Sequence, residues 1–511
     1  MKALQPRPSI VLLYSPLIFD TAFGAVKPEG SLGNIYLAGA LQDAGYEVSI
    51  LDCAVGNDKY SLGNTFFREK KMPNGMVRVG MTTEEILKEI EPYDIVGLSS
   101  IFTAQTNMIV EIVRAIWDTY PEKLIILGGV NARSQPEVFF NAGADIICTG
   151  EAEKTIVEIA DIRSRGSSDF RDVRGVMLMH DGKFSTTCSP EVLQNLDELP
   201  IPRWHMQPLD RYTKIARPHG GGFSDKHPVR YAPLMTSRGC PFKCHFCHIA
   251  KELEGSDSGN LRKLRLKSHG RVMKEMHILK DLGMEHIFIE DDSLLGSKKR
   301  TMGIFKELID LNLKLSGVNG VNIKHMCTRE DAQGRKELGV DGPLLELMAQ
   351  AGFTKIMLPV ESGSRRIIKQ YATDKLDLDQ HDIIGLIQKI KSLGMDAGAN
   401  YTFGYPDETE EEVAQTIALA ERHMEAGLDN ANFMIITPFP GTPLFDLVEE
   451  HGLWLPGVDI TRLDWTNLSI KTIVPAQRYK EVIREEWARI NKPERVNRIR
   501  SMIPMSANGN A

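Results

Sequence analysis

The stretch Met235-Thr-Ser-Arg-Gly-Cys-Pro-Phe-Lys-Cys-His-Phe-Cys-His248 decides how the rest of the chain is interpreted, because it places three cysteines in a C-x3-C-x2-C pattern. A cluster of four irons is normally held by four thiolates, so three thiolates leave one iron open to another ligand. Such an opening indicates catalysis rather than electron storage. A structural zinc site completed by His245 or His248 is the alternative, although such sites usually draw their ligands from two separated pairs. No second pair exists among the remaining cysteines, which are Cys53, Cys148, Cys188 and Cys327.

The cysteine pattern and its neighbours resemble the signature of radical S-adenosylmethionine (SAM) enzymes, in which the amino and carboxylate groups of SAM chelate the open iron. Phe246 matches the aromatic residue that this family carries just before the last cysteine. The resemblance implies that Cys240, Cys244 and Cys247 hold a [4Fe-4S] cluster and take part in catalysis. It also places Phe246 beside bound SAM.

Composition sets the frame for the whole chain. Its 511 residues are 42% hydrophobic and 25% charged, which is ordinary for a globular protein of two to four domains. The net charge of −7 gives no general attraction to nucleic acid or to anionic membranes. Without a signal-peptide core or an apolar run of about 18 residues, we expect a cytoplasmic protein with no integral membrane segment. The seven cysteines fit a reducing compartment.

Short apolar runs alternate with amphipathic segments over residues 1–165. The helical spacing of Met108, Ile112 and Ile116 is typical of the segments between the runs, and Thr82 with Glu85 predicts a capping box. Parallel strands with crossover helices make an α/β, doubly wound, Rossmann-like sheet. The runs predicted as its buried strands are Ile10 to Leu13, Val48 to Leu51, Ile95 to Leu98, Leu124 to Leu127 and Asp145 to Cys148.

Sheets of this kind bind ligands beyond the carboxyl ends of their strands, and small residues there let a ligand approach the backbone. No G-x-G-x-x-G pattern follows the first strand, so a dinucleotide is not the favoured ligand. The sheet alone would also suit a flavodoxin-like or response-regulator domain. The small or flexible residues at its predicted strand ends are Ser99, Ser100, Gly128, Gly129, Gly150 and Glu151.

Four segments in this order resemble those of cobalamin-binding domains fused to radical SAM enzymes. They are Pro28 to Ala38, Asp94 to Ser100, Gly128 to Asn131 and Thr149 to Glu153. The resemblance implies that the domain holds cobalamin. The residues that it places near this cofactor are Ser99, Ser100, Thr103, Gly128, Gly129, Gly150 and Glu151.

The absence of histidine sharpens the cobalamin hypothesis, since all 13 histidines lie at or after His180. Many cobalamin proteins place a histidine from an Asp-x-His-x-x-Gly motif on the lower face of cobalt, but this sheet can supply none. We therefore expect base-off cobalamin with no protein His ligand, and the loop from Ser99 to Gln105 nearest its lower face. A low coordination number eases methyl transfer and access to the cob(I) state.

Beyond the first domain, we expect a linker over residues 166–230, a catalytic domain over 231–447 and a helical segment over 448–511. The linker has loop composition and a small strand pair at Gly175 to Met179 and Lys183 to Thr187. A helical pattern runs from Gln477 to Ile490, before a tail expected to be disordered from Ser506 to Ala511. The alternation of strand and helix in the catalytic domain predicts a partial (β/α)6 TIM-type barrel. Its predicted strands are His286 to Glu290, Lys324 to Cys327, Lys355 to Val360, Asp396 to Thr402 and Ala431 to Thr437.

Four segments near the predicted strand ends resemble elements of cobalamin-type radical SAM enzymes. The resemblance implies that Asp291 or Asp292 accepts hydrogen bonds from the SAM ammonium, although a helix N-cap explains one aspartate equally well. It also implies that Glu361 and Ser362 meet the ribose or methionine portion of SAM. The segments are Glu290 to Ser293, Pro359 to Ser364, Gly398 to Thr409 and Thr437 to Pro443.

Three further residues are candidates on weaker grounds. Arg265, between the cysteines and the second strand, offers a positive group to the SAM carboxylate, unless it belongs to a solvated face. Tyr401 is expected beside the substrate as a catalytic residue. Cys327 is either a hydrogen donor facing the barrel lumen or, more simply, a small buried thiol.

The resemblance implies a cobalamin-dependent radical SAM methyltransferase that methylates an sp3 carbon after a 5′-deoxyadenosyl radical has removed its hydrogen. A cobalamin-linked oxidative ring formation or ring rearrangement is the alternative within this chemistry. A zinc-stabilised corrinoid-binding protein without turnover is the alternative outside it. The expected partners are a small-molecule substrate and a reductant of the flavodoxin or ferredoxin type, with no nucleic acid.

Overall fold

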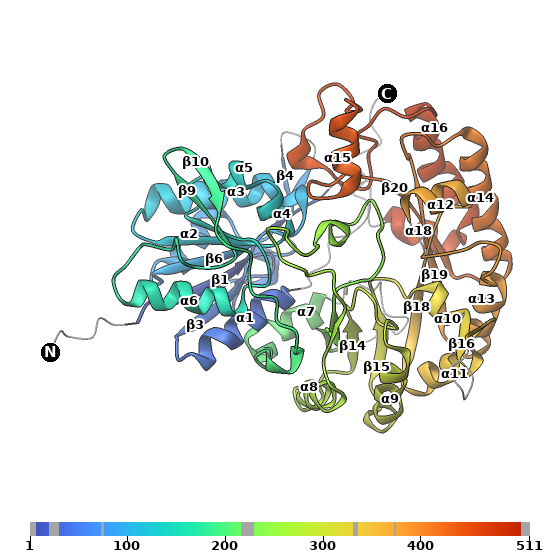
Figure 1. Cartoon of the computed structure of the whole chain (residues 1–511), viewed down its shortest axis with the longest axis horizontal. Helices are drawn as coiled ribbons and strands as arrows, with labels where there is room; N and C mark the ends of the chain where they lie inside the picture. The colour runs from blue at the N-terminus through green and yellow to red at the C-terminus, as the bar shows by residue number, and fades with distance from the viewer. Residues whose placement is uncertain are drawn as a thin grey trace.

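The computed structural model describes residues 7–19, 30–72, 76–215, 229–330, 336–372 and 375–501. Two large sheets account for most of the fold, one in the N-terminal part and one in the C-terminal part (Figure 1). The fold is mixed α/β, as predicted, with a doubly wound sheet before an open barrel.

The N-terminal sheet has seven strands in the order β10-β9-β8-β7-β6-β1-β3. Its five strands from β8 to β3 are parallel. The chain adds β3 on one side of β1 and then returns to add β6, β7 and β8 on the other side, so the strand order reverses between β1 and β6. That reversal is the switch point at which open α/β sheets bind ligands. The five parallel strands are β1 (Ile10–Tyr14), β3 (Val48–Asp52), β6 (Ile95–Ser99), β7 (Leu124–Gly128) and β8 (Ile146–Cys148).

Helices cover both faces of this sheet because successive side chains of a strand point to opposite sides. Ile10 and Leu12 pack in the core under α1 (Leu32–Asp43) and α6 (Glu153–Ser164). Val11 and Leu13 pack in the opposite core, under the remaining helices of the domain. Those helices are α2 (Thr83–Ile90), α3 (Thr106–Thr119), α4 (Val130–Ser134) and α5 (Pro136–Phe140). The predicted capping box of Thr82 and Glu85 is present at the start of α2.

Part of the expected linker belongs to the first sheet. The predicted strand pair forms β9 (Val176–His180) and β10 (Lys183–Thr186), and β9 pairs antiparallel with β8. The hairpin thereby covers the edge of β8, which would otherwise present unpaired backbone groups. The sequence does not predict a small three-stranded sheet that the structure also contains. Its strands are β2 (Leu17–Phe19), β4 (Lys70–Lys71) and β5 (Val77–Val79).

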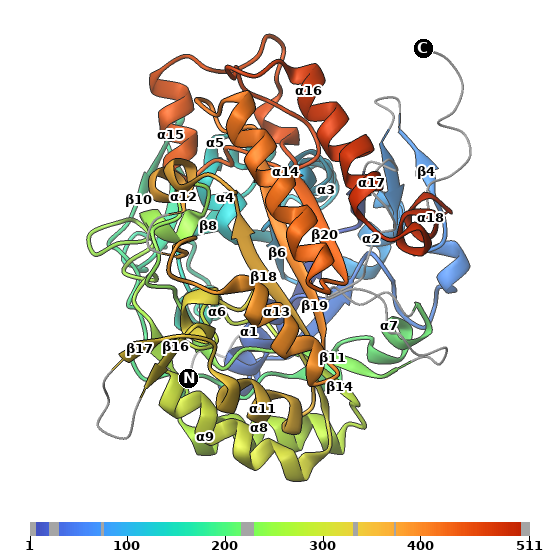
Figure 2. The ribbon, with the colours of Figure 1, turned by 90° about the vertical axis from the view of Figure 1, so that its right-hand side faces the viewer.

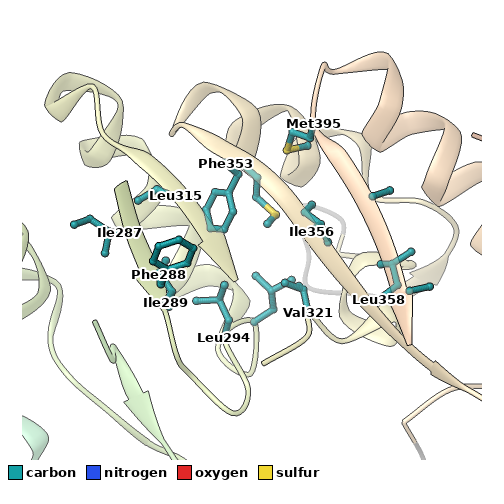
Figure 3. Close-up of a cluster of buried hydrophobic side chains, with 14 of the residues drawn as sticks. Ile287, Phe288, Ile289, Leu294, Leu315, Val321, Phe353, Ile356, Leu358 and Met395 are labelled. Atoms are coloured by element: carbon teal, nitrogen blue, oxygen red, sulfur yellow. The ribbon is translucent and has the colours of Figure 1, made fainter. Parts of the chain in front are cut away.

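The C-terminal sheet has six parallel strands in sequence order, as in an open (β/α)6 barrel. Helices lie along its outer face (Figure 2). Apolar side chains such as Ile287, Leu315 and Ile356 pack between strands and helices (Figure 3). The strands are β11 (Tyr231–Leu234), β14 (His286–Ile289), β15 (Lys314–Gly317), β18 (Phe353–Glu361), β19 (Asp396–Phe403) and β20 (Asn430–Ile435). The outer helices include α8 (His269–Asp281), α9 (Lys298–Leu308), α11 (Gly342–Gln350), α13 (Ile383–Ser392) and α14 (Glu410–Glu425).

The predicted third strand is wrong. The segment from Lys324 lies in the short helix α10 (Ile323–Met326), and β15 comes earlier in the chain. The Lys-Leu-Ser-Gly sequence of β15 has one large apolar residue, so its pattern cannot be told from that of a loop. Cys327 follows α10 rather than a strand and is buried, with its sulfur 3.8 Å from the carbonyl oxygen of Asp382.

The C-terminal segment runs beside the last barrel strand. It begins within α15 (Pro443–Glu450) and contains α16 (Ala476–Glu481), a π-helical turn (Val482–Glu486), α17 (Trp487–Ile490) and α18 (Pro493–Ser501), so the helical pattern predicted from Gln477 to Ile490 is confirmed. Asn491 accepts a hydrogen bond from the backbone nitrogen of Ala431 at 3.0 Å and donates one to its carbonyl oxygen at 2.9 Å. The expected tail from Ser506 lies outside the described residues. Every helix in the described ranges is too short or too polar to cross a bilayer.

Candidate functional site

The three clustered cysteines lie on one loop after β12 (Ser237–Arg238) and before the short turn His248–Lys251. Cys244 is buried, and Cys240 and Cys247 are partly accessible. Burial raises the pKa of Cys244 to about 11 and that of Cys247 to about 12. Coordination to iron would reverse this preference, because a coordinated thiol loses its proton. One loop therefore offers three sulfur ligands, one buried and two partly accessible.

The backbone of this loop is tied to the barrel at several points. The nitrogen of Cys240 donates to the carbonyl oxygen of Arg262 at 3.1 Å, and the nitrogen of His245 donates to that of Tyr371 at 2.8 Å. No three His, Cys, Asp or Glu side chains within the described ranges converge as ligands of one metal ion. A four-iron cluster takes each thiolate on a different iron, so its sulfur ligands need no common point. The donor set thus fits such a cluster.

The two aspartates after β14 have different surroundings. Asp291 is buried and accepts hydrogen bonds at 2.6 Å from the backbone nitrogen and the hydroxyl of Thr236 and from the hydroxyl of Ser237. These contacts fasten the strand that leads into the cysteine loop. Asp292 is exposed and interacts electrostatically with Cys240 and Cys247. Loss of hydration among the surrounding protein atoms, and secondarily the negative charge of Asp291, raise the pKa of Asp292 to about 6.

A lysine that the sequence does not single out also lies near the cysteines. The ammonium of Lys375 forms an ion pair with Glu361 and lies 5.8 Å from the centre of the Phe246 ring. Burial would lower the pKa of Lys375, but the Glu361 carboxylate and the nearby Cys244 hold it above its usual value. A permanent positive charge therefore stands beside the cysteine loop. Its sequence position, after a helix and next to no recognisable motif, gave no signal.

Glu361 owes its position to an unusual backbone. Its φ of 69° is left-handed, a conformation that costs a non-glycine residue of order 1–3 kcal/mol and clusters at functional sites. The register of β18 against β19 shifts between Pro359 and Glu361. The next residue, Ser362, is fully buried, and its hydroxyl lies 3.2 Å from that of Thr416 on α14. Of this predicted pair, Glu361 meets the charged group beside the cysteines and Ser362 packs against a helix.

Tyr401 does not lie beside the other candidate residues. Its side chain is fully buried, its hydroxyl is 2.7 Å from Nδ1 of His423 on α14, and its ring contacts Phe433. Tyr401 thus faces the outer helix rather than the barrel interior. Alternation along β19 gives the interior to Asn400 and Thr402, whose hydroxyl donates to the carbonyl oxygen of Glu361 at 3.2 Å.

At the edge of the first sheet, neutral polar groups form a closed network. The amide of Asn131 donates to the hydroxyls of Ser100 at 2.8 Å and Thr106 at 2.9 Å, and Gln135 donates to Asn131 at 2.8 Å. Gly129, with a φ of 100°, lies so close to the carbonyl oxygen of Ser100 that a Cβ atom would clash with it. Ser99 and Gly128 end the adjacent paired strands. The strand ends of β6 and β7 are thus held together by small residues.

The loop expected under cobalt presents hydrocarbon to solvent. Ile101 and Phe102 are 43% and 40% exposed, whereas Thr103 is buried. The side-chain amide of Gln105 accepts a hydrogen bond from the backbone nitrogen of Ile18 at 3.0 Å and donates one to the Ile18 carbonyl oxygen at 2.9 Å. A flat, amide-rimmed corrin would meet no strong cobalt ligand here. This donor set fits cobalamin bound without a protein imidazole.

Two residues expected at cofactors meet each other instead. The guanidinium of Arg265 makes two contacts of 2.7 Å with the carboxylate of Glu151, and its side chain is 2% exposed. Gly150 adjoins this contact, where a Cβ atom would lie 2.6 Å from Pro190 and 2.9 Å from the carbonyl oxygen of Ser258. The structure thus places Gly150, Glu151 and Arg265 at the junction of the two domains, where the backbone of Arg265 also pairs with that of Arg238 in the strand before the cysteine loop.

Comparisons with known proteins divide the chain in the same way. Residues 27–160 match the B12 binding domain, and residues 234–420 match the radical SAM superfamily. The chain is 26% identical, over 80% of its length and 78% of the relative, to an uncharacterized methyltransferase, PH0819, of Pyrococcus horikoshii. It is 26% identical, over 93% of its length and 87% of the relative, to the cytidylyl-2-hydroxyethylphosphonate methyltransferase of Streptomyces wedmorensis.

A solved structure has the same overall fold. The radical SAM methyltransferase TsrM of Kitasatospora setae, determined with tryptophan substrate and the SAM analogue aza-SAM, superimposes with a TM-score of 0.67. The match covers 98% of this chain and 92% of that one, at 16% sequence identity. The arrangement of sheet and barrel is therefore shared over almost the full length of both proteins.

Proposed function

Because the chain belongs to the cobalamin-dependent radical SAM enzymes, we propose that it is a C-methyltransferase acting on an sp3 carbon of a small molecule. When bound, the cluster and SAM supply a 5′-deoxyadenosyl radical that removes the substrate hydrogen, and methylcobalamin supplies the methyl group. The observation that carries the proposal is the direct contact between the strand ends of the B12 binding domain and the cysteine-loop region of the barrel. Both relatives named above are methyltransferases, which favours methyl transfer over ring formation.

The charges around the cysteine loop suit the two ends of the SAM amino acid. Asp292 offers a carboxylate near Cys240 and Cys247, and Lys375 offers an ammonium near Cys244 and Cys247. A zwitterionic aminocarboxylate lying over an open iron would find an acceptor for its ammonium and a donor for its carboxylate. Asp291 and Glu361 act indirectly in this arrangement, because Asp291 holds the strand before the loop and Glu361 holds Lys375.

The barrel and the first sheet divide the remaining work. The loop of the barrel would orient SAM, and the hydrocarbon of Ile101 and Phe102 would offer no ligand to the metal of a bound cobalamin. Positioning of this kind is the main contribution that a protein makes to cofactor chemistry. We infer that the reducing electron comes from a protein of the flavodoxin or ferredoxin type.

The decisive experiment uses anaerobically purified protein with reconstituted cluster, cobalamin, a reductant and SAM whose methyl group is deuterated. We expect 5′-deoxyadenosine, and a deuterated methyl group first on cobalamin and then on the product. Formation of a new ring without transfer of the label would overturn methylation in favour of a cobalamin-linked cyclisation. A colourless, zinc-loaded protein that forms no 5′-deoxyadenosine would overturn the enzymatic function altogether.

A further inference from the structure

An ion-pair hub centred on Glu252 lies in the junction between the two domains. One carboxylate oxygen of Glu252 pairs with the guanidinium of Arg133 and lies 2.8 Å from Nδ1 of His248. The side chains of Glu252 and Arg133 are only 8% and 15% exposed. Little solvent reaches the Arg133 pair, so it is less screened than the exposed ion pairs of the surface.

The Arg133 arm of the hub begins at the strand ends of β6 and β7, which carry Ser99, Ser100, Gly128 and Gly129 and which we call the cobalamin edge. Arg133 lies in the short helix α4 (Val130–Ser134), which directly follows Gly129 and contains Asn131 of the strand-end network. Its second terminal nitrogen donates to the carbonyl oxygen of Thr149 at 3.1 Å, just beyond β8. The guanidinium is thereby held against the end of β8, and its own helix begins at the end of β7.

The other arm reaches both ends of the cysteine loop. His248 directly follows Cys247, so the Glu252 carboxylate holds the loop at its last cysteine. The carbonyl oxygen of Glu252 accepts from the backbone nitrogen of Arg262 at 3.0 Å, and the Arg262 carbonyl oxygen accepts from that of Cys240 at 3.1 Å. The Glu252 side chain thus ties the last cysteine to the helix that follows Gly129, and the Glu252 backbone carbonyl is linked through Arg262 to the first cysteine.

We propose that Glu252 is a positioning residue that sets the separation between the cobalamin edge and the cluster loop. The proposal rests on the proposed function for the identity of the two cofactors. Glu252 would then couple SAM cleavage to methyl transfer. SAM cleavage needs only the barrel, whereas methyl transfer needs both sites at one fixed geometry. A misplacement of about 1 Å can cost about 10²-fold in such a reaction.

The test compares Glu252→Gln and Arg133→Met with the wild-type holoenzyme. Glu254→Gln is the matched control, because Glu254 is exposed and lies two residues further along the same connecting segment. The first readout is the enhancement by the reduced cluster of the electron-spin relaxation of cob(II)alamin, which depends steeply on their separation. The second is the amount of methylated product, or of labelled methylcobalamin, formed for each 5′-deoxyadenosine.

We expect both Glu252→Gln and Arg133→Met to change the relaxation enhancement and to lower the ratio of methyl transfer to 5′-deoxyadenosine by tenfold or more, with iron and corrin contents unchanged. Arg133→Lys should recover part of both readouts, because it restores the charge. Wild-type values in both variants would overturn the proposal, as would loss of a cofactor, since a positioning residue leaves both sites formed. If either variant does not fold, Glu252→Asp and Arg133→Lys take their place: a change in both readouts in the same direction but smaller than tenfold supports the proposal, and wild-type values overturn it.

The two proposals fail in distinguishable ways. If the wild-type holoenzyme transfers no methyl group, the proposed function fails while the relaxation measurement still reports on the hub. If the wild-type enzyme methylates and the Glu252→Gln variant matches it in both readouts, only the positioning role is lost.

Discussion

The cysteine loop and the cobalamin edge use opposite means to form a cofactor site. Around the cysteines lie charged groups, namely Asp292 and the Glu361–Lys375 pair, with raised thiol pKa values. The edge of the first sheet has neutral hydrogen bonds around Asn131 and a left-handed glycine. The charged groups at that edge, such as Glu151, are used in the domain junction. SAM is a zwitterion that binds iron, so its site requires charged groups. Cobalamin is a large neutral macrocycle, so its site requires mainly a surface of matching shape.

The largest expected effect comes from removing a sulfur ligand from the charged region. Cys244→Ala should abolish assembly of the [4Fe-4S] cluster and reduce 5′-deoxyadenosine formation to background, because three thiolates are the minimum for this cluster. Iron analysis and product quantification check this result. Cobalamin binding should remain, because it depends on the other region; its loss in the same variant would break the comparison.

A single methyl group should affect the neutral region almost as strongly. Gly129→Ala adds a Cβ atom against the Ser100 carbonyl oxygen at a φ of 100°. We expect a loss of stability of roughly 1–3 kcal/mol and at least tenfold weaker binding of cobalamin. Thermal unfolding and titration with hydroxocobalamin measure the two effects. Gly63→Ala in the same domain is the control, since its Cβ would meet only an ordinary contact at 3.7 Å with the Ser61 hydroxyl oxygen.

Removing the positive charge beside the cysteines should weaken SAM binding without disturbing the cluster. Hydrogen bonds to charged groups are worth about 1.5–3 kcal/mol, so Lys375→Met should lower SAM affinity by roughly 10- to 100-fold. Equilibrium binding of SAM to the reconstituted enzyme measures this affinity. Equal affinity in Lys375→Met and wild type would assign the SAM carboxylate to another group.

The pH dependence of SAM binding should follow Asp292. Its carboxylate must be ionised to accept hydrogen bonds from an ammonium, and its pKa is raised to about 6. SAM affinity should therefore be constant well above pH 6 and fall as the pH decreases through that value. The dependence should disappear in Asp292→Asn, which cannot titrate. A dependence that persists in this variant would point to a different titrating group.

Tyr401→Phe should give the smallest effect on chemistry. The substitution removes the buried hydrogen bond to His423, which leaves an unsatisfied partner and costs about 1–3 kcal/mol of stability. The rate of 5′-deoxyadenosine formation per intact cluster should stay within a factor of two of the wild-type rate. A loss of SAM cleavage in a stable Tyr401→Phe protein would restore this residue to the active site.

The sequence predicts the architecture well because both sheets are buried and parallel, which leaves continuous apolar runs such as Ile95 to Leu98. It misses β15 because that strand carries only Leu315 as a large apolar residue. The sequence also assigns too few strands to the N-terminal sheet, because no local pattern shows that β9 pairs with β8.

Prediction of the site follows a similar division. Motif-borne residues such as Cys240 and Asp292 come together, since a short loop and a strand end fix their positions. Lys375 and Glu252 are invisible in sequence, because their roles arise from contacts with residues far away in the chain. Arg265 and Glu151 show the converse error, since two opposite charges near predicted cofactor sites prove to neutralise each other.

We expect this one chain to hold a cluster with an open iron beside a cobalamin that no histidine ligates. Electron paramagnetic resonance of the reduced holoenzyme, recorded with and without SAM, tests it most directly. We predict a cluster signal that changes when SAM is added, together with a base-off cob(II)alamin signal free of nitrogen splitting. A cluster signal indifferent to SAM, or nitrogen splitting on cobalt, would contradict it.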